Sequence, residues 1–101
     1  MYYAGSVRVI RERILGLHPT CKAKETELRA GEEAPFTHIL WMCDEIEKMN
    51  TDTLDGALKA SRWIGWIFAH MEFKRLWDNN RSRDLIQEDE KLNFDLPLSL
   101  R

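Results

Sequence analysis

The chain has 101 residues, of which 44% are hydrophobic and 32% are charged. This length fits one domain over residues 1–101, with a core large enough to fold without disulfides or structural metals. The formal net charge of −2 argues against a general binder of polyanions, although local basic patches stay open. The two cysteines, Cys21 and Cys43, do not form a disulfide framework, so the cytosol is the expected compartment.

Neither a signal peptide nor a membrane span is expected. Charged residues such as Arg8 and Glu12 interrupt the apolar residues near the N-terminus. The longest uncharged run in the most apolar region, residues 63–71, is too short to cross a bilayer. We therefore expect a soluble, cytoplasmic protein without a membrane partner.

The first half of the chain predicts one clear helix and one marginal helix. Apolar residues at helical spacing predict a helix over residues 7–17, with Ser6 as its N-cap and Pro19 beyond its end. Residues 19–30 have few apolar positions and form at best a marginal helix, which Gly31 would stop. Residues 31–35 are a connector.

The second half begins with two strong helices. Residues 36–49 form a helix because six apolar residues share one broad face: Phe36, Ile39, Leu40, Cys43, Ile46 and Met49. Residues 50–53 form a turn that can also cap the following helix, over residues 54–77. The two helices are expected to pair as a long antiparallel hairpin.

The chain ends with a short helix and an extended segment. A helix is expected near residues 82–91, capped by Asn80 or Ser82. In residues 93–101, Phe94, Leu96, Leu98 and Leu100 alternate with other residues, and Pro97 removes a backbone donor. We favour an extended arm that lies on its own or another subunit over a small strand pairing with Val7 and Val9.

The helix over residues 54–77 is apolar on two sides. An aliphatic seam contains Leu54, Ala57, Ser61, Ile64, Phe68 and Met71. Small residues at four-residue spacing beside it (Ala57, Ser61, Gly65 and Ala69) predict a close contact with the helix over residues 36–49. An aromatic seam on the other side contains Trp63, Trp66, His70, Phe73 and Trp77.

The aromatic seam is the candidate interface. Its tryptophans and Phe73 amount to roughly 600–1,000 Å² of apolar surface, more than a monomer usually exposes. The first helix and the C-terminal segment could cover this seam within one chain. Alternatively it meets its own copy, with a dimer favoured, or a different protein. Trp41, on the polar side of its helix, adds a second hint of binding.

Three other interpretations are weaker. The histidine and cysteine spacings, His18-x-x-Cys21 and His38-x4-Cys43, match no known zinc module, so no metal or other cofactor is expected. His70 has no nucleophile or paired acid set beside it by the sequence, so no catalytic residue is assigned. The aromatic residues with Lys59, Arg62 and Lys74 could form a nucleotide-sized pocket between subunits.

The stretch His38-Ile-Leu-Trp-Met42, then Glu45-Ile46, then Lys59-Ala-x-Arg-Trp-Ile-Gly65, resembles small uncharacterised helical proteins of phages, prophages and mobile gene cassettes. Trp77 and Asn79-Asn80-Arg81 extend the likeness to roughly residues 36–84. Phe68 and Ala69 stand where that group carries a Gln-Gly pair. The group has no established activity, so the resemblance implies a mobile-element origin and an accessory role.

The sequence therefore predicts an all-α domain: a small helical bundle built on the hairpin, with an extended C-terminal arm. The expected function is a non-enzymatic accessory protein of a phage or mobile element, acting in the host cytoplasm. It would bind another protein, and this binding could inhibit a host or defence factor. The chain is also expected to self-associate. A small-ligand binder is the first alternative and a DNA-binding regulator the second, although nucleic acid is a disfavoured partner.

Overall fold

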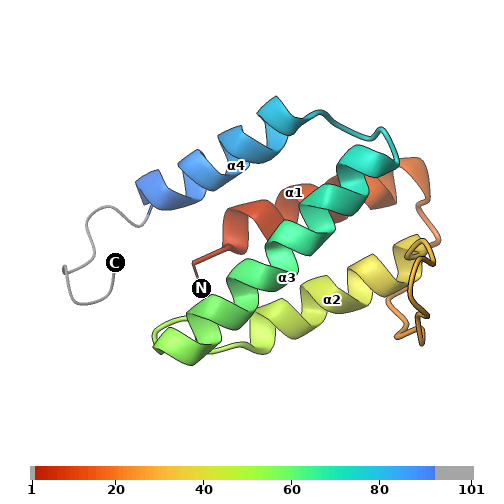
Figure 1. Ribbon diagram of the computed structural model, residues 1–101. Coiled ribbons are helices and arrows are strands. Elements are labelled where there is room, and N and C mark those ends of the chain that lie inside the picture. The colour runs from red at the N-terminus through yellow and green to blue at the C-terminus, as the bar shows by residue number, and fades with distance from the viewer. Residues whose placement is uncertain (1, 93–101) are drawn as a thin grey trace.

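The computed structural model describes residues 2–92, which fold into α-helices joined by turns and loops, with no β-strand in that range (Figure 1). Its four helices are α1 (Ala4–Leu17), α2 (Phe36–Lys48), α3 (Leu54–Phe73) and α4 (Asn79–Leu92). The all-α bundle predicted from the sequence is confirmed. The expected C-terminal arm, residues 93–101, lies outside the described residues.

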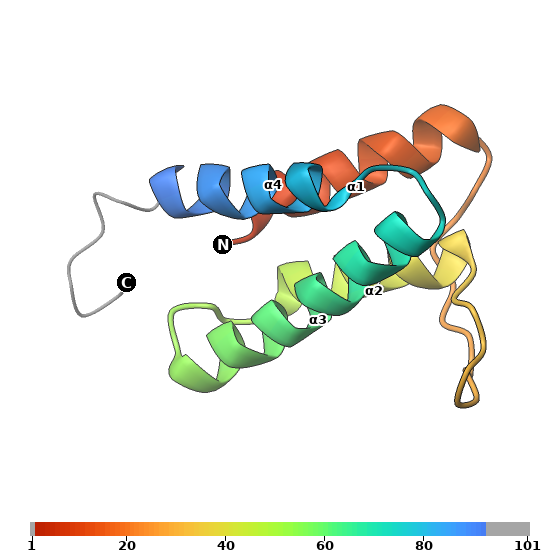
Figure 2. The ribbon, with the colours of Figure 1, turned by 45° about the horizontal axis from the view of Figure 1, so that its top comes forward.

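The helices form two layers (Figure 2). Helices α1 and α4 pack side by side in one layer, and α2 and α3 form the other. Helix α1 also packs against α2, so it joins the two layers. No helix in residues 2–92 has both the length and the apolar character needed to cross a bilayer.

The core lies between the layers and consists mainly of branched aliphatic side chains. All four helices contribute residues that are at most 2% exposed, among them Ile10, Ile14, Ile39, Cys43, Ile46, Ile64, Ile67, Met71 and Leu85. Each such side chain contributes roughly 1.5–3 kcal/mol when it leaves water. The predicted apolar faces of the first helix and of α2 therefore do become core.

Helices α2 and α3 begin where the sequence predicts. The turn before α3 caps it, because the Thr53 hydroxyl accepts the Gly56 N–H at 3.1 Å. Helix α3 ends at Phe73 rather than at residue 77, because Arg75 adopts a left-handed backbone with φ of 60°. At the next helix, Asp78 accepts the Arg81 N–H at 3.0 Å, so Asp78 caps α4 in place of the predicted Asn80 or Ser82.

The marginal helix expected over residues 19–30 does not form. This segment instead lies against the start of α2. The Lys24 N–H donates to the Thr37 carbonyl at 3.0 Å, and the Thr26 N–H donates to His38 Nδ1 at 3.0 Å. With few apolar residues to bury as a helix, the segment satisfies these N–H groups on α2.

The small-residue ridge of α3 does not make the predicted close contact with α2. Ser61, Gly65 and Ala69 are exposed, and a Cβ placed at Gly65 would meet no atom within 4 Å. The helix is rotated so that Ala60, Ile64, Ile67, Phe68 and Met71 face the core. Burying these larger side chains removes more apolar surface from water than burying the ridge would.

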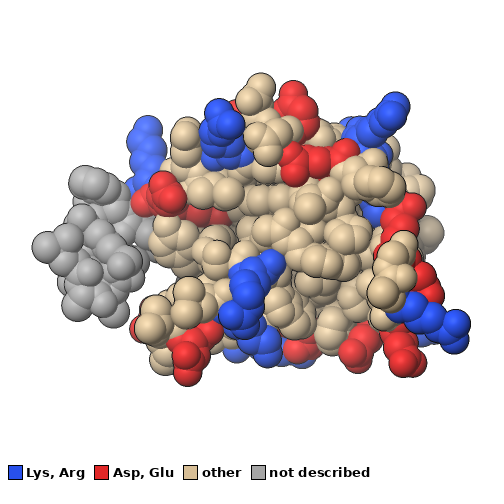
Figure 3. Space-filling model, in the orientation of Figure 1, with Lys and Arg blue, Asp and Glu red and all other residues tan. Residues whose placement is uncertain are grey.

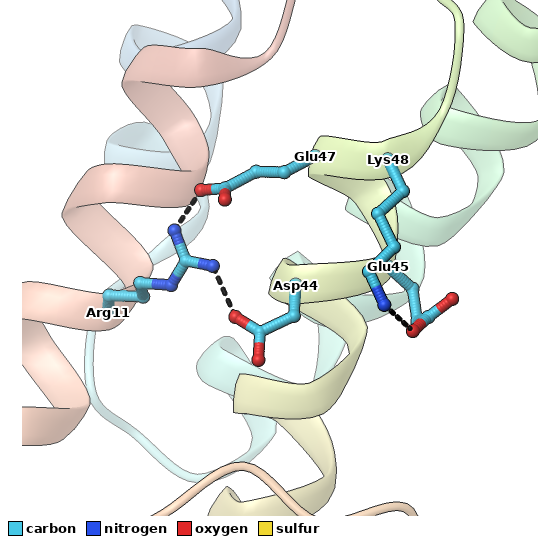
Figure 4. A network of polar contacts seen from close by, with 5 residues as sticks. All are labelled: Arg11, Asp44, Glu45, Glu47 and Lys48. Carbon is cyan, nitrogen blue, oxygen red and sulfur yellow. Dashed lines mark hydrogen bonds and ion pairs between the residues drawn. The ribbon is translucent and has the colours of Figure 1, made fainter.

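An ion-pair network at the surface links α1 to α2 (Figure 4). The Arg11 guanidinium of α1 lies between the carboxylates of Asp44 and Glu47 on α2 and donates to both. The hydrogen bond to Glu47 is the main cause that raises the pKa of Arg11 above its ordinary value. A forked contact of this kind fixes the orientation of the two helices.

The first turn of α1 is capped from α4. Ser6, the predicted N-cap, is instead inside α1 and fully buried, and it donates its hydroxyl proton to the buried carboxyl of Asp89. Asp89 also accepts the backbone N–H groups of Gly5 and Ser6. Burial raises the pKa of Asp89, and the hydrogen bonds from Ser6 partly oppose that rise.

We predict that Asp89→Ala lowers the free energy of unfolding by about 2 kcal/mol, because the Ser6 hydroxyl and the first N–H groups of α1 lose their acceptor. Asp89→Asn keeps an acceptor of the same shape and should lose less than half as much. Chemical denaturation of the two variants measures the difference. Equal losses in both would show that packing, and not the cap, explains the role of Asp89.

Candidate functional site

Five rings from α2 and α3 form a continuous row, which we call the aromatic row: Trp63, Trp41, His38, Trp66 and His70. Their centroids follow one another at 5.8, 5.2, 6.1 and 3.6 Å. The spacings of three and four residues place the members from each helix on one side of it. All five side chains are partly exposed, so the row forms a surface.

His70 lies at one end of the row in a fixed orientation. Its ring stacks on Trp66 with a centroid distance of 3.6 Å and an interplanar angle of 30°. Its Nδ1 lies 2.9 Å from the Trp66 carbonyl oxygen, which can only accept, so Nδ1 carries a proton and donates it. Trp66 and His70 thus form a platform that is ordered before any partner binds.

His38 connects the row to the segment before α2. Its Nδ1 accepts the Thr26 N–H at 3.0 Å, which requires a neutral ring with its proton on Nε2. Burial is the main cause that lowers the pKa of His38, His70 lowers it further, and Glu25 opposes the shift. The neutral form therefore holds the segment in place.

The row opens into a groove of about 800 Å³ between α3 and residues 28–33. Trp66, Ala69, His70 and Phe73 line the α3 side. The opposite wall turns at Gly31, whose φ of 83° favours glycine. Phe73 is 73% exposed beside the groove, an uncommon exposure for a large apolar side chain.

Lys74 fastens the wall of the groove to the end of α3. Its ammonium group lies 2.5 Å from Glu33 Oε1 and 4.7 Å from the centre of the Phe36 ring. The Lys74 side chain is only 11% exposed, and its ammonium group interacts with Glu33 and the Phe36 ring, which hold the wall in place.

The structure brings together most of the predicted interface residues. Trp41, Trp63, Trp66 and His70 belong to the aromatic row, and Phe73 lines the groove. Sequence reasoning considered His38 only as a metal ligand and not as an interface residue, and it did not include the wall over residues 28–33. The position of His38, three residues before Trp41 on the same helix, is the signal that could have revealed its place in the row.

Trp77 lies apart from the row. Its ring contacts Phe68 at a centroid distance of 6.0 Å, and its Nε1–H donates to the Ser82 hydroxyl at 3.0 Å. The early end of α3 is the reason, since the left-handed turn at Arg75 removes Trp77 from the helical spacing. Trp77 therefore joins α3 to the start of α4.

The cationic residues considered for a ligand pocket do not line the groove. The Lys59 ammonium lies 5.5 Å from the centre of the Trp63 ring, at the far end of the row. Arg62 is exposed on α3, and Lys74 is paired with Glu33. Within the groove lining, Arg29 is the cationic residue.

Metal and thiol chemistry find little support at this site. Within residues 2–92, no three side chains of His, Cys, Asp or Glu are grouped to hold a metal ion. Cys43 is buried in the core, and burial raises the pKa of its thiol to about 12. A thiol so rarely ionised is a poor nucleophile and a poor metal ligand.

Comparisons with protein-family models, with curated proteins and with solved structures find no match to this chain.

The histidine contact predicts a pH-dependent stability. The pKa of His38 is lower in the folded chain than its ordinary value of 6.5, so the unfolded chain binds more protons just below that pH. Stability is therefore complete above pH 6.5 and falls as the pH decreases toward the folded pKa. Thermal unfolding between pH 7.5 and 5 should show this fall.

His38→Asn is the matched control, because its Oδ1 takes the position of the histidine Nδ1 and can accept the Thr26 N–H without titrating in this range. This variant should lose less stability on acidification than the native chain. An identical pH profile in the two proteins would contradict the role assigned to His38.

Proposed function

We propose that this chain is a non-enzymatic accessory protein that binds another protein through the aromatic row and the adjoining groove. The observation that carries the proposal is the continuous row of five partly exposed rings that ends in an open groove of about 800 Å³. Tryptophan side chains of this kind dominate binding energy at the centres of protein interfaces. The groove beside them would accept an apolar side chain or a helix of the partner.

The fixed orientation of the rings in the aromatic row supports binding over catalysis. His70 is stacked on Trp66 and bonded to its carbonyl, and His38 is occupied by the Thr26 N–H. Rings held in this way lose little conformational entropy when a partner covers them. The proposal therefore assigns both histidines to recognition.

A DNA-binding role is less well supported. Arg11 is paired with Asp44 and Glu47, Arg8 with Glu12, and Lys74 with Glu33. Basic residues neutralised by neighbouring carboxylates attract phosphates weakly. This agrees with the net charge of −2.

The volume of the groove favours a small ligand as the second candidate. Pockets for small molecules commonly measure roughly 300–1,000 Å³ and combine aromatic walls with a few polar groups. A planar ligand would stack on Trp66 and His70 near Arg29. Thermal stabilisation by a nucleotide panel would favour this candidate over protein binding.

The resemblance to small helical proteins of phages and mobile gene cassettes motivates a biological setting for the proposal. In that setting the chain acts in the cytoplasm of a bacterial host, and its partner is a host or defence protein. Blocking such a partner needs a stable contact surface and no active site, which fits the aromatic row.

The test places a photo-crosslinking aromatic amino acid at Trp63 in a bacterial host. We expect a defined crosslinked partner protein, because an aromatic substitute there keeps the row in contact with it. The same amino acid at Ile86, which is 39% exposed on α4, is the matched control. Equal crosslinking from both positions would contradict the proposal.

Once the partner is purified, Trp66→Ala should weaken its binding by about 2 kcal/mol, roughly 30-fold, because a central tryptophan is removed. His70→Ala should weaken it less, and it tests the same platform without removing a large side chain from the bundle. Calorimetry measures both affinities, and circular dichroism verifies that both variants are folded. Native affinity in both folded variants would exclude the row as the binding site.

A further inference from the structure

A second apolar surface of α3, separate from the aromatic row, faces outward. We call it the outer face of α3, and it consists of Leu54, Leu58, Ser61, Gly65, Ala69 and Phe73, all of which are exposed. Leu54 and Phe73 are each 73% exposed and Leu58 is 50% exposed. Figure 3 shows a broad, mostly uncharged area over this side of the molecule, with a Lys or Arg side chain extending across its middle and other charged residues around its edge.

This face exposes three large apolar side chains to water. At 100° per residue, its members fall within a sector of roughly 120°, between the core residues and the aromatic row. Surface helices normally carry charged residues in such a sector. Here Arg62 and Glu72 are the charged residues between the two ends, and apolar and small residues repeat along the helix, about 30 Å at 1.5 Å per residue.

We propose that a second copy of this chain covers the outer face of α3, with the two α3 helices antiparallel and crossing at Gly65. In this register Ser61 of one copy meets Ala69 of the other, and Leu58 lies level with Glu72 and beside Phe73. Small residues thus lie at the crossing, where the helix axes approach most closely, and large residues lie toward the ends. The pattern complements itself across a two-fold axis, as a symmetric dimer requires.

The charges at the ends of α3 select the antiparallel arrangement. Asp55 lies in the first turn, and Arg75 follows the last turn. Among the ion pairs and hydrogen bonds of residues 2–92, the side chains of Asp55 and Arg75 have no partner. The register that centres on Gly65 brings Asp55 of each copy close to Arg75 of the other, whereas a parallel pair would place like charges together.

Arg62 and Glu72 are the remaining charged residues in this sector: Arg62 is exposed at the edge beside Phe73, and Glu72 is partly buried on the side next to α4. In the proposed register the two copies of Arg62 are about 9 Å apart along the helix axis, six residues at 1.5 Å each. Long side chains at the edge of a contact extend their charges into water, where salt screens them. Arg62 is therefore compatible with the dimer.

The dimer would leave the aromatic row uncovered in both copies. Trp63 and His70 lie on the side of α3 that contacts α2 and residues 28–33, away from Gly65. Leu58 of the second copy would lie beside Phe73 and so would complete one end of each groove. The dimer would thus present two complete binding surfaces.

Gly65→Glu tests the crossing point. Nothing lies within 4 Å of a Cβ at this position, so the monomer accommodates the change, while in the dimer two carboxylates would face each other. Gly16→Glu makes the same substitution at an exposed glycine of α1, where a Cβ also meets no atom within 4 Å, and is the matched control. Sedimentation over a concentration series should give a dimer for the native chain and for the control, and a folded monomer for Gly65→Glu.

A charge exchange tests the orientation. Asp55→Arg alone and Arg75→Asp alone should each raise the dimer dissociation constant roughly tenfold, since two exposed ion pairs are lost and like charges meet. The double variant restores both pairs and should restore the native constant. A native chain that stays monomeric at high micromolar concentration, a dimeric Gly65→Glu, or a double variant no tighter than the single ones would overturn the proposal.

The dimer and the proposed function share Ala69 and Phe73, which line the groove, but their tests have different outcomes. Gly65→Glu should keep the partner that crosslinks at Trp63, because the aromatic row lies on the other side of α3. Loss of the dimer with retained crosslinking supports both proposals. A native dimer that Gly65→Glu dissociates, without a partner that crosslinks at Trp63, would refute the proposed function and leave the dimer supported.

Discussion

A helix that is apolar on more than one side can fully bury only one of them in a single small domain, and α3 is such a helix. The two-layer packing resolves this constraint by turning Ile64, Ile67 and Met71 toward the core. The aromatic side is then half covered by α2 and by the segment before it. The outer face stays in contact with water. Every surface that we assign to binding follows from this unequal division of one helix.

The segment between α1 and α2 determines what the aromatic side can do. As an irregular segment it is anchored at Thr26 by His38 and at Glu33 by Lys74, and between these anchors it forms a wall. The groove therefore depends on two contacts that proton and salt concentrations can weaken.

The sequence predicts those parts of the fold in which periodicity and burial agree. Helix α2 has one broad apolar face and starts at the predicted residue, and the Thr53 cap is local. The Asp89 cap of α1 is not predictable in this way, because its two partners are 83 positions apart. The rotation of α3 also escapes prediction, since two apolar seams offer two solutions and only packing selects between them.

The sequence predicts which residues form the candidate site better than it predicts how they are arranged. Spacing alone placed Trp63, Trp66 and His70 together, whereas Trp77 left the series when the left-handed residue Arg75 ended the helix. His38 was considered as a metal ligand, and its actual contact is a backbone N–H, which no spacing rule reveals.

The two apolar surfaces of α3 also differ in what they offer a partner. The aromatic row consists of large rings held by neighbours, which suits a partner of different shape that supplies its own apolar side chains. The outer face has small residues at its centre and opposite charges at its ends, which suits a partner with the same features reversed. A second copy of the chain supplies those features by symmetry. One helix can therefore serve assembly on one side and recognition on the other. Phe73 belongs to both surfaces, so it would contact both the second copy and the bound partner.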